Sequence, residues 1–181
     1  DYKNGFGFFS FADGAAPATK SAVKETVVFP NSSFYNSGGS TNGLRSGDTL
    51  KLGTFLAGTN IGFFVASNGF SSSTGLTTVP TGGPPGGDWI FYTLKNLNSE
   101  SDASLRAHTV LLYDVATSQV VLGMEDILRT NSGCDHDFND ILFTVYSVPA
   151  DAIDTGDLVE IPDPGDDDGD GVLDENDDYP E

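Results

Sequence analysis

An all-β fold is predicted for this chain by three features of its sequence. Gly, Asn, Ser and Pro recur at short intervals, and the short segments between them are rich in Val, Ile, Leu, Thr, Phe and Tyr. No window shows a long helical period with capping residues. Strands at this spacing indicate an antiparallel β-sandwich or jelly roll with long loops.

The expected strands follow one another along the first 150 residues. Residues 5–11 alternate Gly and Phe, and seven further segments have strand composition: Val23–Phe29, Asp48–Phe55, Asn60–Ala66, Trp89–Leu94, Thr109–Asp114, Gln119–Met124 and Asp140–Val148. The segment Asp-Val-Ala-Thr-Ser-Gln between Tyr113 and Val120 suits a hairpin connection, and Asp126–Thr130 is a candidate for one helical turn. Two long Gly-, Ser- and Pro-rich stretches, Asn31–Gly43 and Ser71–Gly87, are expected to be surface loops.

Size and charge exclude several classes of protein. The chain has 181 residues, enough for one core, and 8 Lys and Arg against 27 Asp and Glu. Phosphate binding needs clustered cations, so we expect neither a nucleic-acid partner nor docking on anionic lipid. No apolar run is long enough to span a bilayer, and no signal peptide opens the chain, which indicates a mature fragment or a cytosolic protein. The one cysteine, Cys134, excludes an internal disulfide and a multi-cysteine metal site.

The acidic residues are concentrated at the end of the chain. Residues 151–181 hold 14 of the 27 acids and no Lys or Arg, whereas residues 1–150 hold 13 acids and all 8 basic residues. We therefore predict a β-sandwich domain over residues 1–150 and an acidic tail over residues 151–181. Such a tail is usually solvated or disordered, but it can also bind hard cations.

The tail contains the spacing of a calcium-binding loop. Residues 166–177 read Asp-Asp-Asp-Gly-Asp-Gly-Val-Leu-Asp-Glu-Asn-Asp, with Gly171 at the sharp turn that such a loop requires. The predicted ligands are Asp166, Asp168, Asp170, the backbone carbonyl of Val172, Asp174 and Asp177. Asp177 stands where these loops usually have Glu. Amphipathic helices do not flank the loop, so it is not a sensor EF-hand; it resembles the calcium repeats of thrombospondin type 3. The alternative is a disordered acidic tail.

A second group of oxygen donors lies in the domain itself. Its members flank one loop between two predicted strands: Glu125, Asp126, Asp135, Asp137, Asn139 and Asp140. Carboxylates gathered in this way are costly unless a cation neutralises them, and Ca²⁺ takes six to eight oxygens in irregular geometry. In an extended segment Asp135, Asp137 and Asn139 point to one side, and Phe138 on the other side could anchor the loop in the core. The alternative is a solvated acidic hairpin.

This group resembles the G-x-E-D … D-x-D-[FY]-N-D signature of a bacterial extracellular domain of unknown function. That domain occurs in LruC-domain-containing proteins and in large secreted adhesins, and the resemblance covers roughly residues 45–148. Supporting matches are residues 57–64 (Ala-Gly-Thr-Asn-Ile-Gly-Phe-Phe) and 108–114 (His-Thr-Val-Leu-Leu-Tyr-Asp). The resemblance implies a calcium-binding β-sandwich outside the cell, often on surface or biofilm-associated proteins.

Catalysis is not expected. The acids cluster on one loop where a bound ion would keep them ionised, and a Gly-x-Ser-x-Gly elbow is absent. His108 and His136 lack a spaced partner for zinc, and each is more often structural or exposed than catalytic. Cys134 has no nearby cation in the sequence to lower its pKa, so an inert thiol is expected.

Two functions remain for a non-catalytic calcium-binding module. The first is carbohydrate binding by an extracellular adhesion protein, in which a sugar diol contacts the calcium held by Asp135, Asp137 and Asn139. Tyr35 and Trp89 are candidates to stack on the sugar, although Trp89 also suits core packing at a strand start. The second is a structural spacer that calcium only rigidifies. The sequence indicates neither the sugar nor the oligomeric state.

Overall fold

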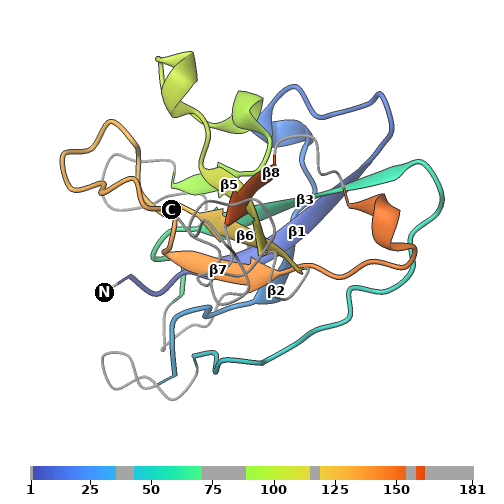
Figure 1. The fold of residues 1–181 in the computed structure, drawn as a ribbon. Helices are drawn as coiled ribbons and strands as arrows, with labels where there is room; N and C mark the ends of the chain where they lie inside the picture. Colours follow the sequence, from blue (N-terminus) through green and yellow to red (C-terminus); the bar gives the residue numbers. More distant parts are fainter. Residues whose placement is uncertain (1, 36–42, 71–88, 115–118, 154–157, 162–181) are drawn as a thin grey trace, which may run out of the picture. The chain divides into compact units, whose positions relative to one another are not determined.

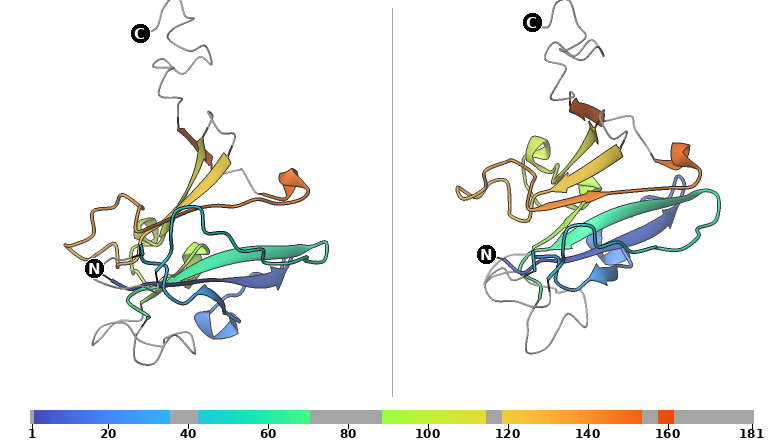
Figure 2. Two further views of the ribbon diagram at one scale, coloured as in Figure 1. Left: turned by 90° about the horizontal axis from the view of Figure 1, so that it is seen from below. Right: turned by 60° about the horizontal axis from the view of Figure 1, so that its bottom comes forward.

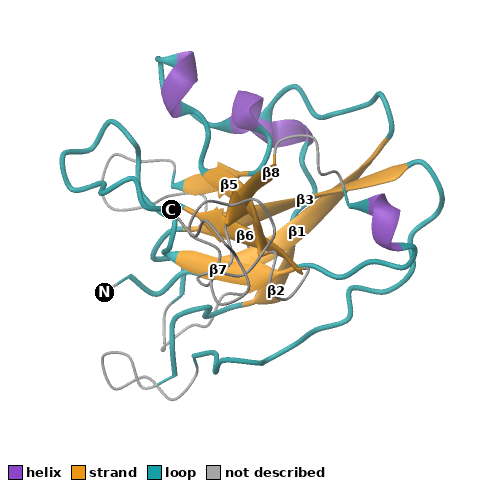
Figure 3. Cartoon of the chain, viewed as in Figure 1, coloured by secondary structure: helices purple, strands orange, loops and turns teal. Residues whose placement is uncertain are grey.

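The computed structural model describes residues 2–35, 43–70, 89–114, 119–153 and 158–161. Strands and short 3-10 helices form the regular structure of these segments (Figure 3), so the all-β prediction is confirmed. In these segments no helix has the length and apolar character needed to cross a membrane. The chain divides into two compact units, residues 1–108 with 125–137, and residues 109–124 with 138–181.

The first unit contains a four-stranded antiparallel sheet in the order β2-β1-β3-β4. The strands are β1 (Gly5–Ala12), β2 (Thr26–Phe29), β3 (Thr59–Ala66) and β4 (Ile90–Tyr92). The long strands β1 and β3 pair over their whole length and lie side by side (Figure 2). The described residues of the same unit also form the 3-10 helices η1 (Lys20–Ala22), η3 (Lys95–Leu97) and η4 (Ala103–Leu105).

Alternating Gly and Phe in β1 packs aromatic rings on both faces of this sheet. Phe9 lies opposite Gly62 of β3, where a Cβ would overlap its ring, so the glycine makes room for the aromatic side chain. On that face Phe9, Phe64 and Tyr92 belong to the hydrophobic core. On the other face Phe6 stacks on Phe63, with ring centroids 5.8 Å apart. Burial on both faces explains why the segment is aromatic rather than simply amphipathic.

The second unit contains another four-stranded sheet, in the order β7-β6-β5-β8 (Figure 1). The strands are β5 (Thr109–Asp114), β6 (Gln119–Met124), β7 (Ile141–Thr144) and β8 (Leu158–Ile161), and the 3-10 helix η5 (Ala150–Ala152) precedes β8. Asp114 pairs with Gln119, so β5 and β6 form the predicted hairpin. The strand β8 lies beyond residue 150 and pairs with β5 in parallel, which the sequence did not indicate.

Two predicted elements are wrong. Asp48–Phe55 is irregular and exposed, because Gly47 and Gly53 adopt positive φ angles of 88° and 112° that interrupt an extended strand. Asp126–Thr130 forms no helical turn; the N–H of Asn131 donates to the carbonyl of Leu128 in a tight turn instead. The predicted strand Asp140–Val148 is shortened to β7.

Candidate metal centre

The loop that carries the predicted ligands runs from the end of β6 to the residues before β7, and its two ends lie next to each other. Met124, the last residue of β6, forms an isolated bridge with Asn139. Beside it, a Cβ on Gly123 would overlap the carbonyl oxygen of Phe138, so only glycine permits this close approach. The glycine of the G-x-E-D motif therefore brings the two ends of the loop together.

Glu125 and Asp126 follow β6 and are both buried, with exposed fractions of 0% and 7%. The N–H of Glu125 donates to the carbonyl of His108 at 3.0 Å. The Oδ2 atom of Asp126 accepts a 2.5 Å hydrogen bond from Asn4 Nδ2. Burial of two adjacent carboxylates is unusual, and each needs compensation from its surroundings.

Two short turns direct the chain back toward Glu125. Asn131 Oδ1 accepts from the N–H of Gly133 at 2.9 Å, and the N–H of Cys134 donates to the carbonyl of Asn131 at 3.1 Å. His136 and Phe138 then adopt left-handed φ angles of 62° and 57°. The expectation of a simple extended segment is therefore wrong, and Phe138 is half-buried rather than a fully buried anchor. Non-glycine residues rarely adopt this conformation, and those that do are often found at functional sites.

Three carboxylates of the first unit converge as a result. Each of Glu125, Asp135 and Asp137 offers an oxygen, and these atoms all lie within 4.8 Å of one another. Two oxygens bound to one Ca²⁺ at its usual bond lengths lie at most about 5 Å apart, so the spacing fits a shared ion. Glu125 is buried, whereas Asp135 and Asp137 are exposed. The cluster can therefore hold a cation with one side toward protein and the other toward water.

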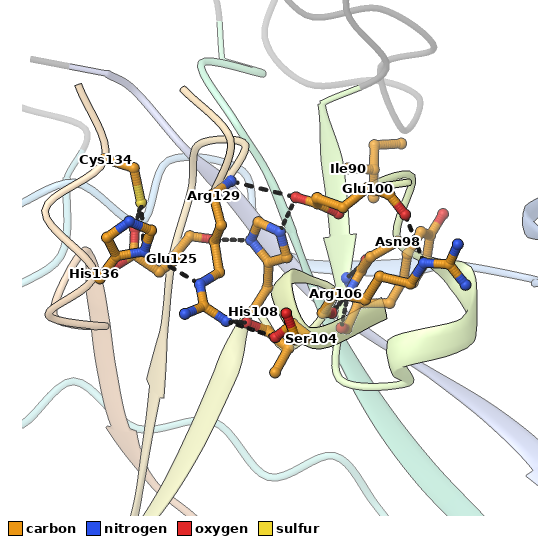
Figure 4. Close-up of polar contacts among 12 residues, drawn as sticks. Ile90, Asn98, Glu100, Ser104, Arg106, His108, Glu125, Arg129, Cys134 and His136 are labelled. Atoms are coloured by element: carbon orange, nitrogen blue, oxygen red, sulfur yellow. Dashed lines mark hydrogen bonds and ion pairs between the residues drawn. The ribbon is translucent and has the colours of Figure 1, made fainter. Parts of the chain in front are cut away.

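Polar side chains surround the buried member of this cluster (Figure 4). The thiol of Cys134 donates to Glu125 Oε2 at 3.2 Å, and Arg129 Nε donates to His136 Nδ1 at 3.3 Å. Desolvation raises the pKa of Cys134 to about 11, with a further contribution from its hydrogen bond to Glu125. The thiol is therefore protonated at neutral pH, in keeping with the expectation of an inert cysteine.

The converging group contains neither Asp126 nor Asp140. Asp126 points to Asn4 and is not a member of the converging group. Asn139 and Asp140 are exposed and belong to the second unit, as does the bridge between Asn139 and Met124. The predicted tail ligands Asp166, Asp168, Asp170, Val172, Asp174 and Asp177 lie outside the described residues.

The two candidate aromatic ligand-binding residues have different surroundings. Tyr35 is half-buried, and the guanidinium carbon of Arg45 lies 4.0 Å from its ring centroid. Trp89 is half-buried, packs edge-on against Tyr2 at 6.0 Å, and has a buried Nε1 atom without a hydrogen-bond partner. An indole edge that is buried in this way suits packing at the start of β4 more than an exposed stacking platform.

Sequence reasoning missed the buried polar residues behind the cluster. His108 and Glu100 are 0% and 3% exposed, and His108 Nε2 lies 2.6 Å from Glu100 Oε1. Asn4, the partner of Asp126, was missed as well. These residues come from distant parts of the chain, and of the three only His108 lies in a segment that the family resemblance covers with a quoted match. The one sequence signal was the position of His108 directly before the apolar segment Thr109–Tyr113.

The fold and the convergent acids agree with a family assignment. Residues 55–147, just over half of the chain, match the model of a domain of unknown function, DUF4114. The chain therefore belongs to this family, and the match includes all three converging carboxylates. No curated protein and no solved structure shows significant similarity to the chain.

Proposed function

We propose that this protein is a non-catalytic calcium-binding module that recognises carbohydrate in a calcium-dependent way. The observation that carries the proposal is the convergence of Glu125, Asp135 and Asp137 within 4.8 Å, with one buried member and two exposed members. Three carboxylates at this distance repel one another, and a bound cation would offset that repulsion.

Calcium is the cation that best matches these donors. All three are carboxylates, which together supply up to six oxygens, and Ca²⁺ accepts six to eight in irregular geometry. Magnesium demands near-ideal octahedral geometry, and zinc prefers nitrogen and sulfur donors. A half-exposed site of this kind corresponds to the weak calcium affinities of extracellular modules, with dissociation constants of about 10⁻⁴–10⁻³ M. The proposal includes a location outside the cell, on an adhesion or surface protein, where free calcium is abundant enough for a weak site.

The glycan part of the proposal rests on the exposed side of the cluster. Water would complete the coordination of an ion beside Asp135 and Asp137, because both side chains are exposed. Two adjacent hydroxyls of a sugar can replace such waters without opening a filled coordination shell. A single sugar would bind with a dissociation constant between about 10⁻³ and 10⁻⁶ M, and many copies on a surface would raise the avidity.

A second function is favoured by the buried side of the same cluster. Glu125 is bonded through its backbone to His108, so an ion at its carboxylate would fasten the loop to this residue. In that case calcium would rigidify a structural spacer that has no glycan ligand. The sequence motif of the tail, residues 166–177, fits a second ion with the same rigidifying role.

A glycan array probed in calcium and in chelator separates the two functions. Carbohydrate binding that disappears in chelator supports the first, and a calcium-stabilised protein that binds no glycan in either condition supports the spacer. Two variants test the contact itself. Asp137→Ala should abolish glycan binding, whereas Asp170→Ala in the tail should leave it nearly unchanged, because the tail loop has enough oxygens to fill its own ion. Equal losses in both variants would contradict direct contact.

A further inference from the structure

The polar residues behind the candidate metal centre form a continuous network within the first unit. Glu100 follows η3, His108 directly precedes β5, and Arg129 lies in the loop between Glu125 and Asp135. Figure 4 shows their hydrogen bonds extending from Glu100 through His108 to Glu125, and from Arg129 to His136. The proposed function uses Glu125 as a ligand but assigns no role to Glu100, His108, Arg129 or His136.

The directions of the hydrogen bonds follow from the chemistry of each atom. The carbonyl oxygen of Glu125 can only accept, so His108 Nδ1 carries a proton and donates to it at 3.3 Å. The N–H of Glu125 returns a hydrogen bond to the carbonyl of His108 at 3.0 Å. His108 therefore holds the backbone of Glu125 at two points. Its ring is also fixed from the side, because it stacks on Phe91 with centroids 4.0 Å apart.

Glu100 connects His108 to Arg129, which lies in the loop between Glu125 and Asp135. Its Oε1 atom contacts His108 Nε2 at 2.6 Å and accepts from the backbone N–H of Arg129 at 3.3 Å. One carboxylate oxygen thus holds Arg129 directly and Glu125 through the imidazole. Its other oxygen, Oε2, is buried without a hydrogen-bond partner, so burial of this carboxylate costs free energy.

Arg129 extends the support to the exposed side of the cluster. Its Nη1 donates to the carbonyl of Ala107 at 3.1 Å, and its Nε donates to His136 Nδ1 at 3.3 Å. His136 stands between Asp135 and Asp137 in the chain and has a left-handed backbone. The guanidinium of Arg129 thus holds His136 in place. The backbone of His136 sets the direction of Asp135 relative to Asp137.

We propose that Glu100, His108 and Arg129 are positioning residues of the metal centre, which hold Glu125 and the Asp135–Asp137 turn in the geometry that an ion requires. This inference rests on the proposed metal-binding function and extends it beyond the ligands. Partners that orient metal ligands commonly contribute 10-fold to 100-fold to metal affinity. A purely structural group of equal burial would contribute to stability and leave affinity unchanged.

The test compares metal affinity with stability in one set of full-length variants. Every variant carries Asp170→Ala, so that the tail loop does not obscure the domain site in a calorimetric titration with CaCl₂. His108→Phe keeps an aromatic ring against Phe91 and removes both nitrogens. Phe9→Leu is the matched control, because it weakens the core of the same unit at a ring that packs against Phe11 and Tyr92. Melting in chelator measures the stability of each variant without metal.

We expect His108→Phe to weaken calcium binding about 10-fold to 100-fold. Phe9→Leu should lower the melting temperature and leave the affinity unchanged. His108→Asn should recover part of the lost affinity, because an asparagine amide can place a donor near the position of Nδ1. If His108→Phe does not fold, Glu100→Gln decides by the same comparison, with a loss of several-fold expected.

The failures of the two proposals are distinguishable. If the parent with Asp170→Ala shows no saturable calcium binding, the metal centre itself is wrong, and the positioning role is lost with it. If the parent binds calcium while His108→Phe and Glu100→Gln bind with the parent's affinity, the metal centre stands and the positioning role is overturned.

Discussion

Glu125 and Asp126 are adjacent and buried, yet they lie in two different electrostatic environments. Asp126 faces Asn4, whose amide donates directly to its carboxylate. Glu125 faces two further carboxylates, Asp135 and Asp137. The first environment supplies a donor from the protein, and the second supplies negative charge. Burial alone therefore does not identify a metal ligand; the groups that face the carboxylate decide its role.

The surroundings of Asp126 and Glu125 also differ in the contacts that stabilise them. Asn4 accepts from the N–H of Asn68 through its own Oδ1, and its carbonyl accepts from the N–H of Ser32, so the Asp126 side is fixed by the N-terminal segment. The Glu125 side is completed by a loop with left-handed residues and two exposed aspartates. We expect the first to be formed without metal and the second to depend on it.

The largest expected effect is on calcium affinity. Glu125→Gln removes the buried charge of the cluster and should weaken calcium binding at least about 100-fold, which corresponds to about 2.7 kcal/mol. Asp126→Asn should change the affinity less than about threefold, because that carboxylate faces Asn4. Calorimetric titration of both variants checks the contrast, and similar losses would show that both acids bind the ion.

The next effect is stabilisation by the ion itself. Calcium at about a hundred times its dissociation constant should stabilise the domain by about 2.7 kcal/mol. Denaturant unfolding in calcium and in chelator measures the difference. Asp126→Asn should keep this increment and Glu125→Gln should lose it. An unchanged midpoint in chelator would contradict the domain site.

An effect of similar or smaller size, independent of the ion, is expected at the Asp126–Asn4 pair. Asp126→Ala leaves the buried amide of Asn4 with one donor unsatisfied, which should cost about 1–3 kcal/mol in calcium and in chelator alike. A double-mutant cycle with Asn4→Ala should show coupling between the two positions. A cost that appears only in calcium would assign Asp126 to the metal.

The smallest effect concerns Cys134, which donates to the buried carboxylate. Because the folded-state pKa of this thiol is raised from 9.0 to about 11, the protonated form is favoured in the folded protein. Its contribution to stability is full below pH 9 and is lost as the pH rises through 11. Thiolate absorbance should titrate near pH 11 in chelator and at lower pH in calcium, since an ion at Glu125 opposes the negative charge that holds the proton. The same midpoint in both conditions would separate the thiol from the ion.

The sequence predicted the strands best where composition and turns agreed. Thr109–Asp114 and Gln119–Met124 match β5 and β6 because apolar residues occupy most positions of both and a short connection separates them. Asp48–Phe55 has a lower share of apolar residues, and Gly53 with its positive φ interrupts the segment that Gly47, also with a positive φ, directly precedes. The parallel strand β8 could not be predicted, because its partner β5 lies about 45 residues away in the chain.

The candidate site was likewise predicted only where its residues are close in the sequence. Motif spacing brought Glu125, Asp135 and Asp137 together correctly, since a short loop must bring its two ends close. Spacing could not distinguish Glu125 from Asp126, because the partner of Asp126 comes from position 4. The contact between Glu100 and His108 could not be predicted from the sequence either, because it depends on how η3 and η4 place these residues beside the loop.

The central claim is that Glu125, Asp135 and Asp137 share one calcium ion. Anomalous scattering from a crystal grown in calcium tests it most directly. We predict an anomalous peak about 2.3–2.6 Å from a carboxylate oxygen of each of the three residues, with Asp126 still hydrogen-bonded to Asn4 and not coordinating. Saturating calcium without a peak between these carboxylates, or a peak coordinated by Asp126 in place of Glu125, would contradict the account.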